Sequence, residues 1–309
     1  MVVYMGLATF VISIVHGLLW GVVLGAVSAG LTLIWGVMKV VNVAHGEVAL
    51  LGSYLIVGLY CALGLSPYIA LIIALASGLA VGIAMYWGML HKLVGKVEVM
   101  TLRVEMSTLL IMFAFSVAIT NSYYYFIGSE PKGLGLWHFG PKSNINIGYL
   151  VIRTNSILAC ILAVALVAVL HLLLAKTTLG KAIRAVMQDA QAASLVGINP
   201  VKIKMQTTMI SIAVTMLSGF LILLHETSII PGTAALYTPL SFVIVVLGGL
   251  GNIMGSFVGG LIIGLVYGLS KAVIASVFNP LASAPLALSI AFIILVLTLL
   301  FKPEGLFGR

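Results

Sequence analysis

The feature that most constrains the fold is a series of long apolar runs with few charges between them. An α-helix needs about 20 apolar residues to cross the hydrocarbon core of a bilayer. These runs do not alternate apolar and polar residues, as the strands of a membrane β-barrel do. The sequence therefore predicts an all-α polytopic membrane protein. The main runs are residues 18–38, 68–90, 106–126, 150–175, 205–224, 253–278 and 286–301.

The composition excludes a water-soluble fold. Only 7% of the 309 residues are charged and 62% are hydrophobic, whereas soluble domains carry about 25% charged residues. With the shorter apolar segments 48–63 and 240–250, we expect about eight or nine membrane segments in a single transmembrane domain over residues 1–309. Residues 1–15 have no basic residue and no cleavage site, so we expect an entry helix there and no signal peptide.

The positive charges predict the orientation in the bilayer. Residues 91–105, 176–204 and 302–309 hold ten of the 15 Lys and Arg residues. Because an excess of Lys and Arg marks cytoplasmic loops, we expect these segments and the C-terminus in the cytoplasm. The net charge of +8 is interpreted in the same way and does not indicate a nucleic-acid partner.

A polar patch interrupts the first apolar region. Residues 42–47 read Asn-Val-Ala-His-Gly-Glu, with apolar sequence on both sides. A charged side chain at the bilayer centre costs about 2.5–3.5 kcal/mol, so Glu47 is not expected to face lipid. Two interpretations stay open: Asn42, His45, Gly46 and Glu47 line the permeation path or lock a helix break, or Glu47 only caps a helix. His45 has no second strong ligand at helical spacing, so no metal site is predicted.

A second interruption lies near the end of the chain, at Gly248, Gly249, Gly251 and Asn252. Clustered glycines break a helix and expose its carbonyl groups, which is tolerated only where they are buried or line water. Residues 30–52 show the same order of apolar run, break and small residues. Paired interrupted segments are typical of the central site of a transporter, so we expect inverted-repeat halves with both breaks beside the path.

Glycines also repeat every four residues, which strips one helix face down to backbone and predicts close helix packing. The repeats are Gly17, Gly21 and Gly25; Gly251, Gly255 and Gly259; and Gly260, Gly264 and Gly268.

The longest polar segment, residues 176–204, favours one amphipathic helix from Lys181 to Val196, with Gly197 at its end. The apolar positions of this helix are Ile183, Val186, Met187, Ala190 and Leu195. Such a helix either lies on the lipid surface or docks in a groove of a cytoplasmic partner. The sequence pattern alone leaves both interpretations open.

Four motifs in order, at residues 30–47, 184–199, 246–260 and 300–308, resemble those of branched-chain amino-acid ABC transporter permeases of the smaller, H-type subunit. Gln-Ala-Ala followed by Gly197 is similar to the Glu-Ala-Ala-x3-Gly loop of ABC importer permeases, with Gln in place of Glu. The resemblance implies a coupling helix that seats in an ATPase subunit. Its residues are Lys181, Arg184, Gln188, Asp189, Ala192, Ala193 and Gly197.

The resemblance implies a cell-membrane permease subunit that imports branched-chain or related hydrophobic amino acids by ATP-driven alternating access. Its implied partners are two cytoplasmic ABC ATPase subunits, a second homologous permease chain in a heterodimer or homodimer, and an extracytoplasmic substrate-binding protein. No cofactor is implied. The sequence has no Walker A pattern, so ATP hydrolysis is assigned to the partners and the chain is not expected to be an enzyme.

Three alternatives remain. A permease of the same family can carry amides, urea or other small polar solutes, and a stand-alone secondary transporter would need no ATPase. An intramembrane enzyme would need a second catalytic residue facing the polar patch. The sole candidate pair is His225 with Glu226, which we interpret as an interfacial turn near the outer face.

Overall fold

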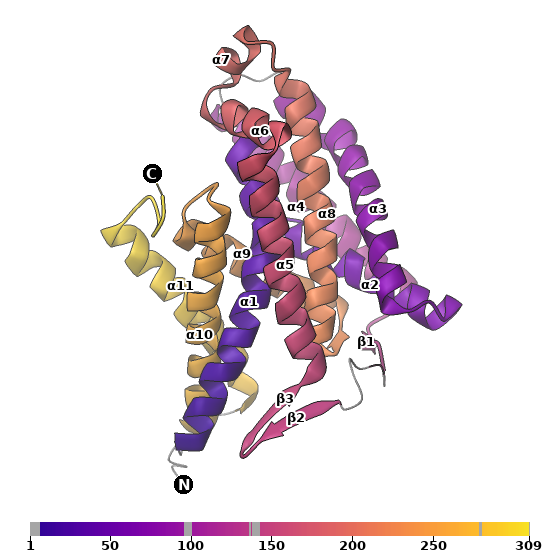
Figure 1. Ribbon diagram of the computed structural model, residues 1–309, viewed down its shortest axis with the longest axis vertical. Coiled ribbons are helices and arrows are strands. Elements are labelled where there is room, and N and C mark those ends of the chain that lie inside the picture. The colour runs from indigo at the N-terminus through magenta and orange to yellow at the C-terminus, as the bar shows by residue number, and fades with distance from the viewer. Residues whose placement is uncertain (1–6, 96–100, 136, 138–142, 278–279, 309) are drawn as a thin grey trace.

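The computed structural model describes residues 7–95, 101–135, 137, 143–277 and 280–308. These residues form a bundle of long helices with two very short sheets at one end (Figure 1). Within them, nine helices are long and apolar enough to cross a membrane. The predicted all-α polytopic fold is confirmed, while the predicted inverted-repeat relation and the single domain stay predictions.

The spans follow the hydropathy pattern closely, with two differences at their ends. The first span begins at Leu7 rather than at residue 18, because residues 7–17 are also mostly apolar. The third continues as a π-helix, η1 (Tyr86–Gly95), into the predicted polar connection. The spans are α1 (Leu7–Met38), α2 (His45–Leu63), α3 (Pro67–Met85) with η1, α4 (Leu102–Phe126), α5 (Thr154–Lys176), α8 (Pro200–Glu226), α9 (Ala234–Gly248) after the 3-10 turn η2 (Pro231–Thr233), α10 (Ile253–Val277) and α11 (Pro280–Phe301).

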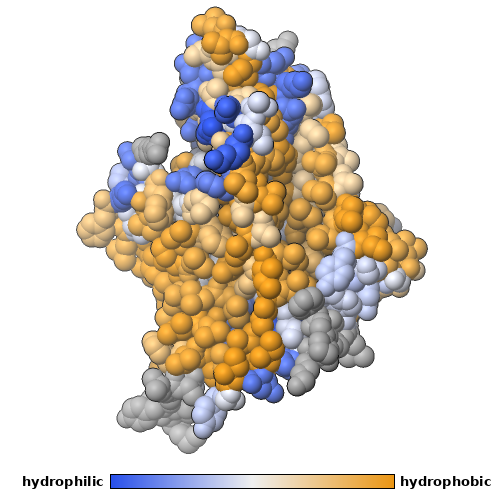
Figure 2. Space-filling model, viewed as in Figure 1, coloured by the Kyte–Doolittle hydropathy of each residue, from blue (hydrophilic) through white to orange (hydrophobic). Residues whose placement is uncertain are grey.

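The two ends of the bundle differ in character. One end carries the short helices α6 (Thr178–Gln188) and α7 (Ala190–Leu195), and the opposite end carries the start of α1 and the hairpin of β2 (Asn144–Ile147) and β3 (Leu150–Arg153) (Figure 1). At that second end β1 (Lys132–Gly133) also pairs antiparallel with β4 (Ser228–Ile229). Figure 2 shows hydrophobic side chains over the middle of the visible face and hydrophilic ones gathered around α6.

The prediction of one continuous helix from Lys181 to Val196 is wrong. The chain divides into α6 and α7 at Asp189, whose backbone is extended with φ −156°. The Asp189 carboxylate accepts hydrogen bonds from the backbone N–H groups of Gln191 (2.8 Å) and Ala192 (3.0 Å). A short acidic side chain satisfies the free N–H groups of a helix start, so Asp189 starts a second helix instead of continuing the first.

The glycine repeats allow close helix packing, as predicted: the repeat on α1 and the repeat Gly260, Gly264 and Gly268 bring α1 against α10, whereas Gly255 and Gly259 pack against α9. A Cβ added to Gly21 would lie 2.8 Å from the carbonyl oxygen of Gly260, and one added to Gly264 would lie 2.2 Å from the Cα of Gly21. The same contact continues one turn further on, where a Cβ added to Gly268 would lie 2.7 Å from the Cα of Gly17. The two backbones therefore touch over several turns.

Helix α8 is the central helix of the bundle. It packs against α1, α2, α3 and α5, and most of its membrane-crossing window is buried. Its small hydroxyl side chains face α1, where Ser211 donates to the carbonyl oxygen of Gly30 at 2.7 Å and Ser218 to that of Ala26 at 3.3 Å. These bonds join the two helices at the depth where the first interruption lies.

Candidate translocation and coupling sites

The first interruption is a connection that turns back into the bundle. We name residues 39–44, between α1 and α2, the first break. Helix α1 ends at Met38, and Lys39 has a left-handed backbone (φ 55°) at the point where the chain reverses. Helix α2 then begins with His45, whose Nε2 lies 2.9 Å from the carbonyl oxygen of Val27. At a rise of about 1.5 Å per residue, Val27 lies about 16 Å before the end of α1, so α2 starts well inside the bundle.

The predicted patch of residues 42–47 is therefore divided between the break and the helix. Asn42 lies in the first break, where its Oδ1 accepts a hydrogen bond from the backbone N–H of Ala44 at 3.1 Å. His45, Gly46 and Glu47 instead form the first turn of α2. All four predicted residues are buried.

These side chains join α2 to four other helices. The His45 ring contacts Val27 on α1, and its Nδ1 lies 3.4 Å from the Thr215 hydroxyl on α8. On α9, the Thr238 hydroxyl accepts from the backbone N–H of Gly46 at 2.8 Å. On α4, Ser116 donates to Glu47 Oε1 at 2.7 Å. The geometry of the cluster is that of a lock that holds the start of α2 in place.

Glu47 has one carboxylate oxygen in use and one without a partner. Oε1 accepts from Ser116 and, at 3.5 Å, from Thr120, while the Tyr123 hydroxyl donates to the Glu47 backbone carbonyl at 2.6 Å. Oε2 is buried with no hydrogen-bond partner among the described residues. A carboxylate in the first turn of a helix is favoured by the helix dipole, and the two interpretations of Glu47, as a lock or as a cap alone, stay predictions.

The second interruption is confirmed as a break between two helices. Helix α9 ends at Gly248 and α10 begins at Ile253, and we name residues 249–252 the second break. Gly249 and Gly251 have left-handed φ values of 98° and 82°. Asn252 accepts from the backbone N–H of Gly255 at 3.0 Å, which satisfies the start of α10.

The C-terminal tail covers the second break. The Asn252 side-chain amide donates to the carbonyl oxygen of Phe307 at 3.1 Å, and the Leu306 N–H donates to that of Leu247 at 2.7 Å. A Cβ added to Gly249 would lie 2.6 Å from the backbone nitrogen of Gly308. The tail motif that the sequence resemblance includes is thus part of the same site.

One methionine on α6 joins the end of α1 to the second break. A Cβ added to Gly36 would lie 2.7 Å from the methyl carbon of Met187 and 3.1 Å from the Cα of Gly251. One added to Gly251 would lie 3.1 Å from the same methyl carbon. Met187 therefore lies against both the end of α1 and the second break, beside a cavity of about 620 Å³ that is also lined by Arg184 and Gln188. Sequence reasoning placed Met187 on an apolar face but did not assign it to the site.

The predicted coupling residues lie at the end of the bundle that α6 and α7 form. Helix α6 buries Ile183 and Val186, and the Arg184 guanidinium donates to the carbonyl oxygen of Leu174 on α5. Lys181, Gln188, Asp189, Ala192 and Gly197 are exposed, whereas Ala193 is buried.

Beyond α6, the chain leaves apolar side chains exposed at the tip of the molecule. Leu195 is 88% exposed and Val196 is 75% exposed. Figure 2 shows hydrophobic surface at the α7 end of the visible face, above the hydrophilic side chains around α6. Leu195 was predicted on the apolar face of one helix, and that prediction is wrong because Asp189 redirects the chain. An exposed apolar tip is typical of a protein contact surface.

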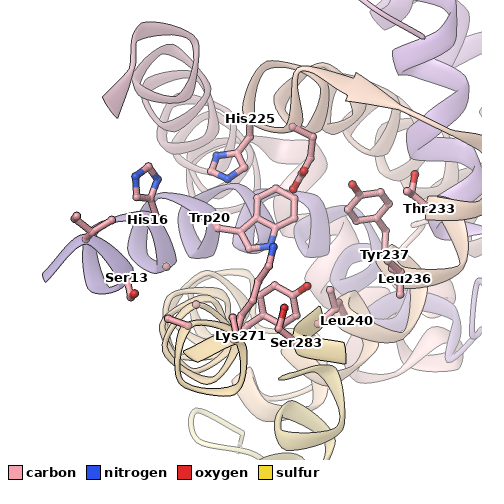
Figure 3. Close-up of a pocket in the computed structure, with 17 residues that line it drawn as sticks. Ser13, His16, Trp20, His225, Thr233, Leu236, Tyr237, Leu240, Lys271 and Ser283 are labelled. Carbon is pink, nitrogen blue, oxygen red and sulfur yellow. The ribbon is translucent and has the colours of Figure 1, made fainter. Parts of the chain in front are cut away.

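A second cavity was missed by sequence reasoning. It lies at the end of the bundle opposite α7, and its lining includes His225 and Glu226 together with Lys271 (Figure 3). The interpretation of His225 and Glu226 as a simple interfacial turn is therefore incomplete. The signal was Lys271, a single cation inside the apolar run 253–278, because ionisable residues within membrane segments face a partner or a cavity.

The bundle of long apolar helices with two interruptions defines the class of this protein: a multi-pass helical membrane protein. Residues 13–299 match the family described as branched-chain amino acid transport system / permease component, so the chain belongs to this family. A permease component of this kind is a transport subunit and not an enzyme, and the predicted family resemblance is confirmed.

Similar proteins extend over nearly the whole chain. The High-affinity branched-chain amino acid transport system permease protein BraD of Pseudomonas aeruginosa is 27% identical over 308 residues, which is 96% of this chain and 95% of BraD. The High-affinity branched-chain amino acid transport system permease protein LivH of Escherichia coli K12 is 27% identical over 308 residues, which is 97% of this chain and 96% of LivH. The Probable branched-chain amino acid transport permease protein LivH of Methanocaldococcus jannaschii is 28% identical over 289 residues, 90% of this chain and 86% of its own.

A solved structure supports the fold. One chain of "PsaBC from Streptococcus pneumoniae in complex with Fab" superposes with a TM-score of 0.51 over 94% of this chain and 92% of that chain. The sequence identity is 13%, so the likeness is one of fold.

Proposed function

We propose that this chain is the membrane-spanning permease subunit of an ATP-driven importer for branched-chain or related hydrophobic amino acids. The family membership and the names of the relatives support this substrate class. The proposed partners are two cytoplasmic ABC ATPase subunits, a second homologous permease chain and an extracytoplasmic substrate-binding protein. In this proposal the chain lies in the cell membrane, and the α7 end and the C-terminal tail face the cytoplasm, as the distribution of Lys and Arg favours.

The observation that carries the coupling proposal is the contact of Met187 with both Gly36 and Gly251. The exposed Leu195 and Val196 on the tip offer an apolar contact to an ATPase groove. A displacement of α7 moves α6, and Met187 on α6 transmits it to the end of α1 and to the second break. Because those two segments adjoin the interrupted helices, one movement reorients both.

Reconstitution of the complete transporter in proteoliposomes tests this route, with ATP hydrolysis and leucine uptake measured together. Met187→Ala is expected to keep ATP hydrolysis near the wild-type rate while uptake falls several-fold, because the ATPase still docks but its movement is no longer transmitted. Leu195→Asp is expected to lower both rates, because it removes the docking contact. Met106→Ala, on the exposed face of α4, is the matched control and is expected to change neither.

Full uptake by Met187→Ala would contradict the coupling route. Uptake by this chain without ATPase partners would contradict the ATP-driven function and favour a secondary transporter. Uptake of urea or acetamide in place of leucine would move the substrate class to small polar solutes while leaving the coupling route intact.

A further inference from the structure

The cavity at the end of the bundle opposite α7 has the size of a small-molecule site. Its volume is about 560 Å³, within the range of about 300–1,000 Å³ that is common for ligand pockets. Residues of α1, α8, η2, α9, α10 and α11 line it (Figure 3). The first helix and the last part of the chain thus converge on one cavity, on the side from which an importer receives its substrate.

Charges of both signs face this cavity. Glu226 is the last residue of α8, Lys271 lies on α10, and the two are close enough to interact electrostatically. Both side chains are exposed. The carbonyl groups at a helix C-terminus carry partial negative charge, so the α8 end with Glu226 favours an ammonium group, while Lys271 favours a carboxylate.

Much of the remaining lining is aromatic and apolar, and Ser13, His16, Thr233 and Ser283 add polar groups. The Trp20 ring stacks on His225 with ring centroids 4.6 Å apart and 20° between planes, and it meets Tyr237 edge-on at 6.2 Å. Leu236 and Leu240 lie on the same side as Tyr237 (Figure 3). The Nδ1 atom of His225 is buried with no hydrogen-bond partner in the described part of the chain, which is a further polar group available to a ligand.

We propose that this cavity is a reception site for a zwitterionic amino acid on the outer side of the permease. Glu226 and the end of α8 hold the α-ammonium group, Lys271 holds the α-carboxylate, and the apolar side chain lies against Trp20. A ligand with one charge would satisfy only one of the two charged groups, whereas a zwitterion pairs both. The inference rests on the proposed function, which supplies the amino acid as the substrate class.

Trp20 makes the site measurable in the intact transporter. The chain has four tryptophans, so replacing Trp35, Trp87 and Trp137 by Phe leaves Trp20 as the one tryptophan of this chain in the complete complex in lipid nanodiscs, and subtracting the spectrum of the same nanodisc complex with Trp20→Phe removes the emission of the partner chains. L-leucine is expected to give a saturable change in Trp20 emission. L-leucinamide lacks the carboxylate and 4-methylpentanoate lacks the ammonium group. For each of them, the concentration that gives half of the maximal Trp20 change is expected to be higher than that of leucine by about tenfold or more, the effect of losing one charged hydrogen bond.

Two charge-removing variants give a pattern that misfolding cannot imitate. Glu226→Gln is expected to weaken leucine binding by about tenfold. It is also expected to reduce the difference in affinity between leucine and 4-methylpentanoate, which has no ammonium group for Glu226 to bind. Lys271→Gln is expected to weaken leucine binding to the same extent. In this variant the difference in affinity between leucine and leucinamide is expected to be reduced, because leucinamide has no carboxylate for Lys271 to bind. Glu105→Gln and Lys176→Gln remove matched charges at the opposite end of the bundle and are expected to leave all three titrations unchanged.

The outcomes separate this site from the proposed function. Equal responses to leucine and both analogues, or no response with normal leucine uptake in both variants, would overturn the site and leave the function standing. The reciprocal pattern without ATP-driven uptake would support the site and reject the function. A lipid headgroup with an ammonium and a phosphate shares this chemistry, so a Trp20 change caused by phosphatidylethanolamine in the nanodisc, with none caused by leucine, would overturn the amino acid as the ligand.

Discussion

The two breaks interrupt helices in different ways. At the first break, side chains do the holding: the His45 ring and the Glu47 carboxylate connect the start of α2 to α1, α8 and α4. At the second break, the holding groups are two left-handed glycines, the Asn252 side chain and the backbone of the C-terminal tail. The first break is fixed by side chains that reach other helices inside the bundle, and the second mainly by backbone groups at the end of the bundle, with one amide side chain.

The depth of each break explains the difference. Inside a bilayer, freed backbone groups must find partners within the protein, and the first break leads from the end of α1 to the start of α2, which lies about 16 Å deeper and among buried residues. The second break lies near the α6 end, where Leu250 is exposed and a cavity is adjacent. A short glycine turn is sufficient there, so its conformation can change at lower cost than that of the first break.

The largest expected effect comes from crowding the first break. Gly46→Val would place a Cβ 2.3 Å from the carbonyl oxygen of Ala234 and 3.1 Å from the backbone nitrogen of Thr238. Because neither contact can yield without moving α9, we expect the free energy of unfolding to fall by about 3 kcal/mol. Thermal unfolding in detergent measures the change.

Gly58→Val is the matched control on the same helix, since an added Cβ at Gly58 meets nothing within 4 Å. It is expected to stay within about 1 kcal/mol of the wild type. Equal stability of the two variants would show that α2 and α9 are not tightly packed at the first break.

An intermediate effect is expected from Glu47→Gln. Glutamine keeps an oxygen that accepts from Ser116, so assembly is expected to stay near the wild-type level. The negative charge at the start of α2 is lost, together with its interaction with the helix dipole, and leucine uptake is expected to fall several-fold. Comparison of purified yield with uptake in proteoliposomes measures both, and normal uptake would reduce Glu47 to a structural cap.

The smallest effect is expected at the second break. Asn252→Ala removes the bonds to Gly255 and Phe307 and is expected to cost about 1–2 kcal/mol of unfolding free energy. Asn252→Asp keeps the acceptor for Gly255 but loses the amide donor to Phe307, so about half of that loss is expected. If both variants lost equal stability, the contact with the tail would account for the whole effect; if Asn252→Asp lost none, the tail would contribute nothing.

The sequence predicts the membrane fold because apolar length is a local property. The α1–α10 packing also follows from a local pattern, since glycines every four residues expose the backbone, although the pairing of these two helices does not. The second break is predicted for the same reason, because glycine clusters act on their own segment. These features need no knowledge of distant residues.

Other features depend on contacts between distant segments. Asp189 occurs in a helix-favouring segment, and only the folded chain shows that it caps a new helix. Met187 is an ordinary apolar residue until Gly36 and Gly251 are placed beside it. Glu226 and Lys271 are far apart in sequence, and each is unremarkable until the bundle brings both to one cavity.

The glycine contact between α1 and α10 also limits how these two helices can move. With glycines every four residues on both faces, a slide of one, two or three residues would bring side chains against backbone where there is now no room. The next register that matches glycine to glycine lies about 6 Å away, four residues along the helix. The pair therefore has discrete sliding positions, and a smaller displacement must carry α1 and α10 together as one rigid body.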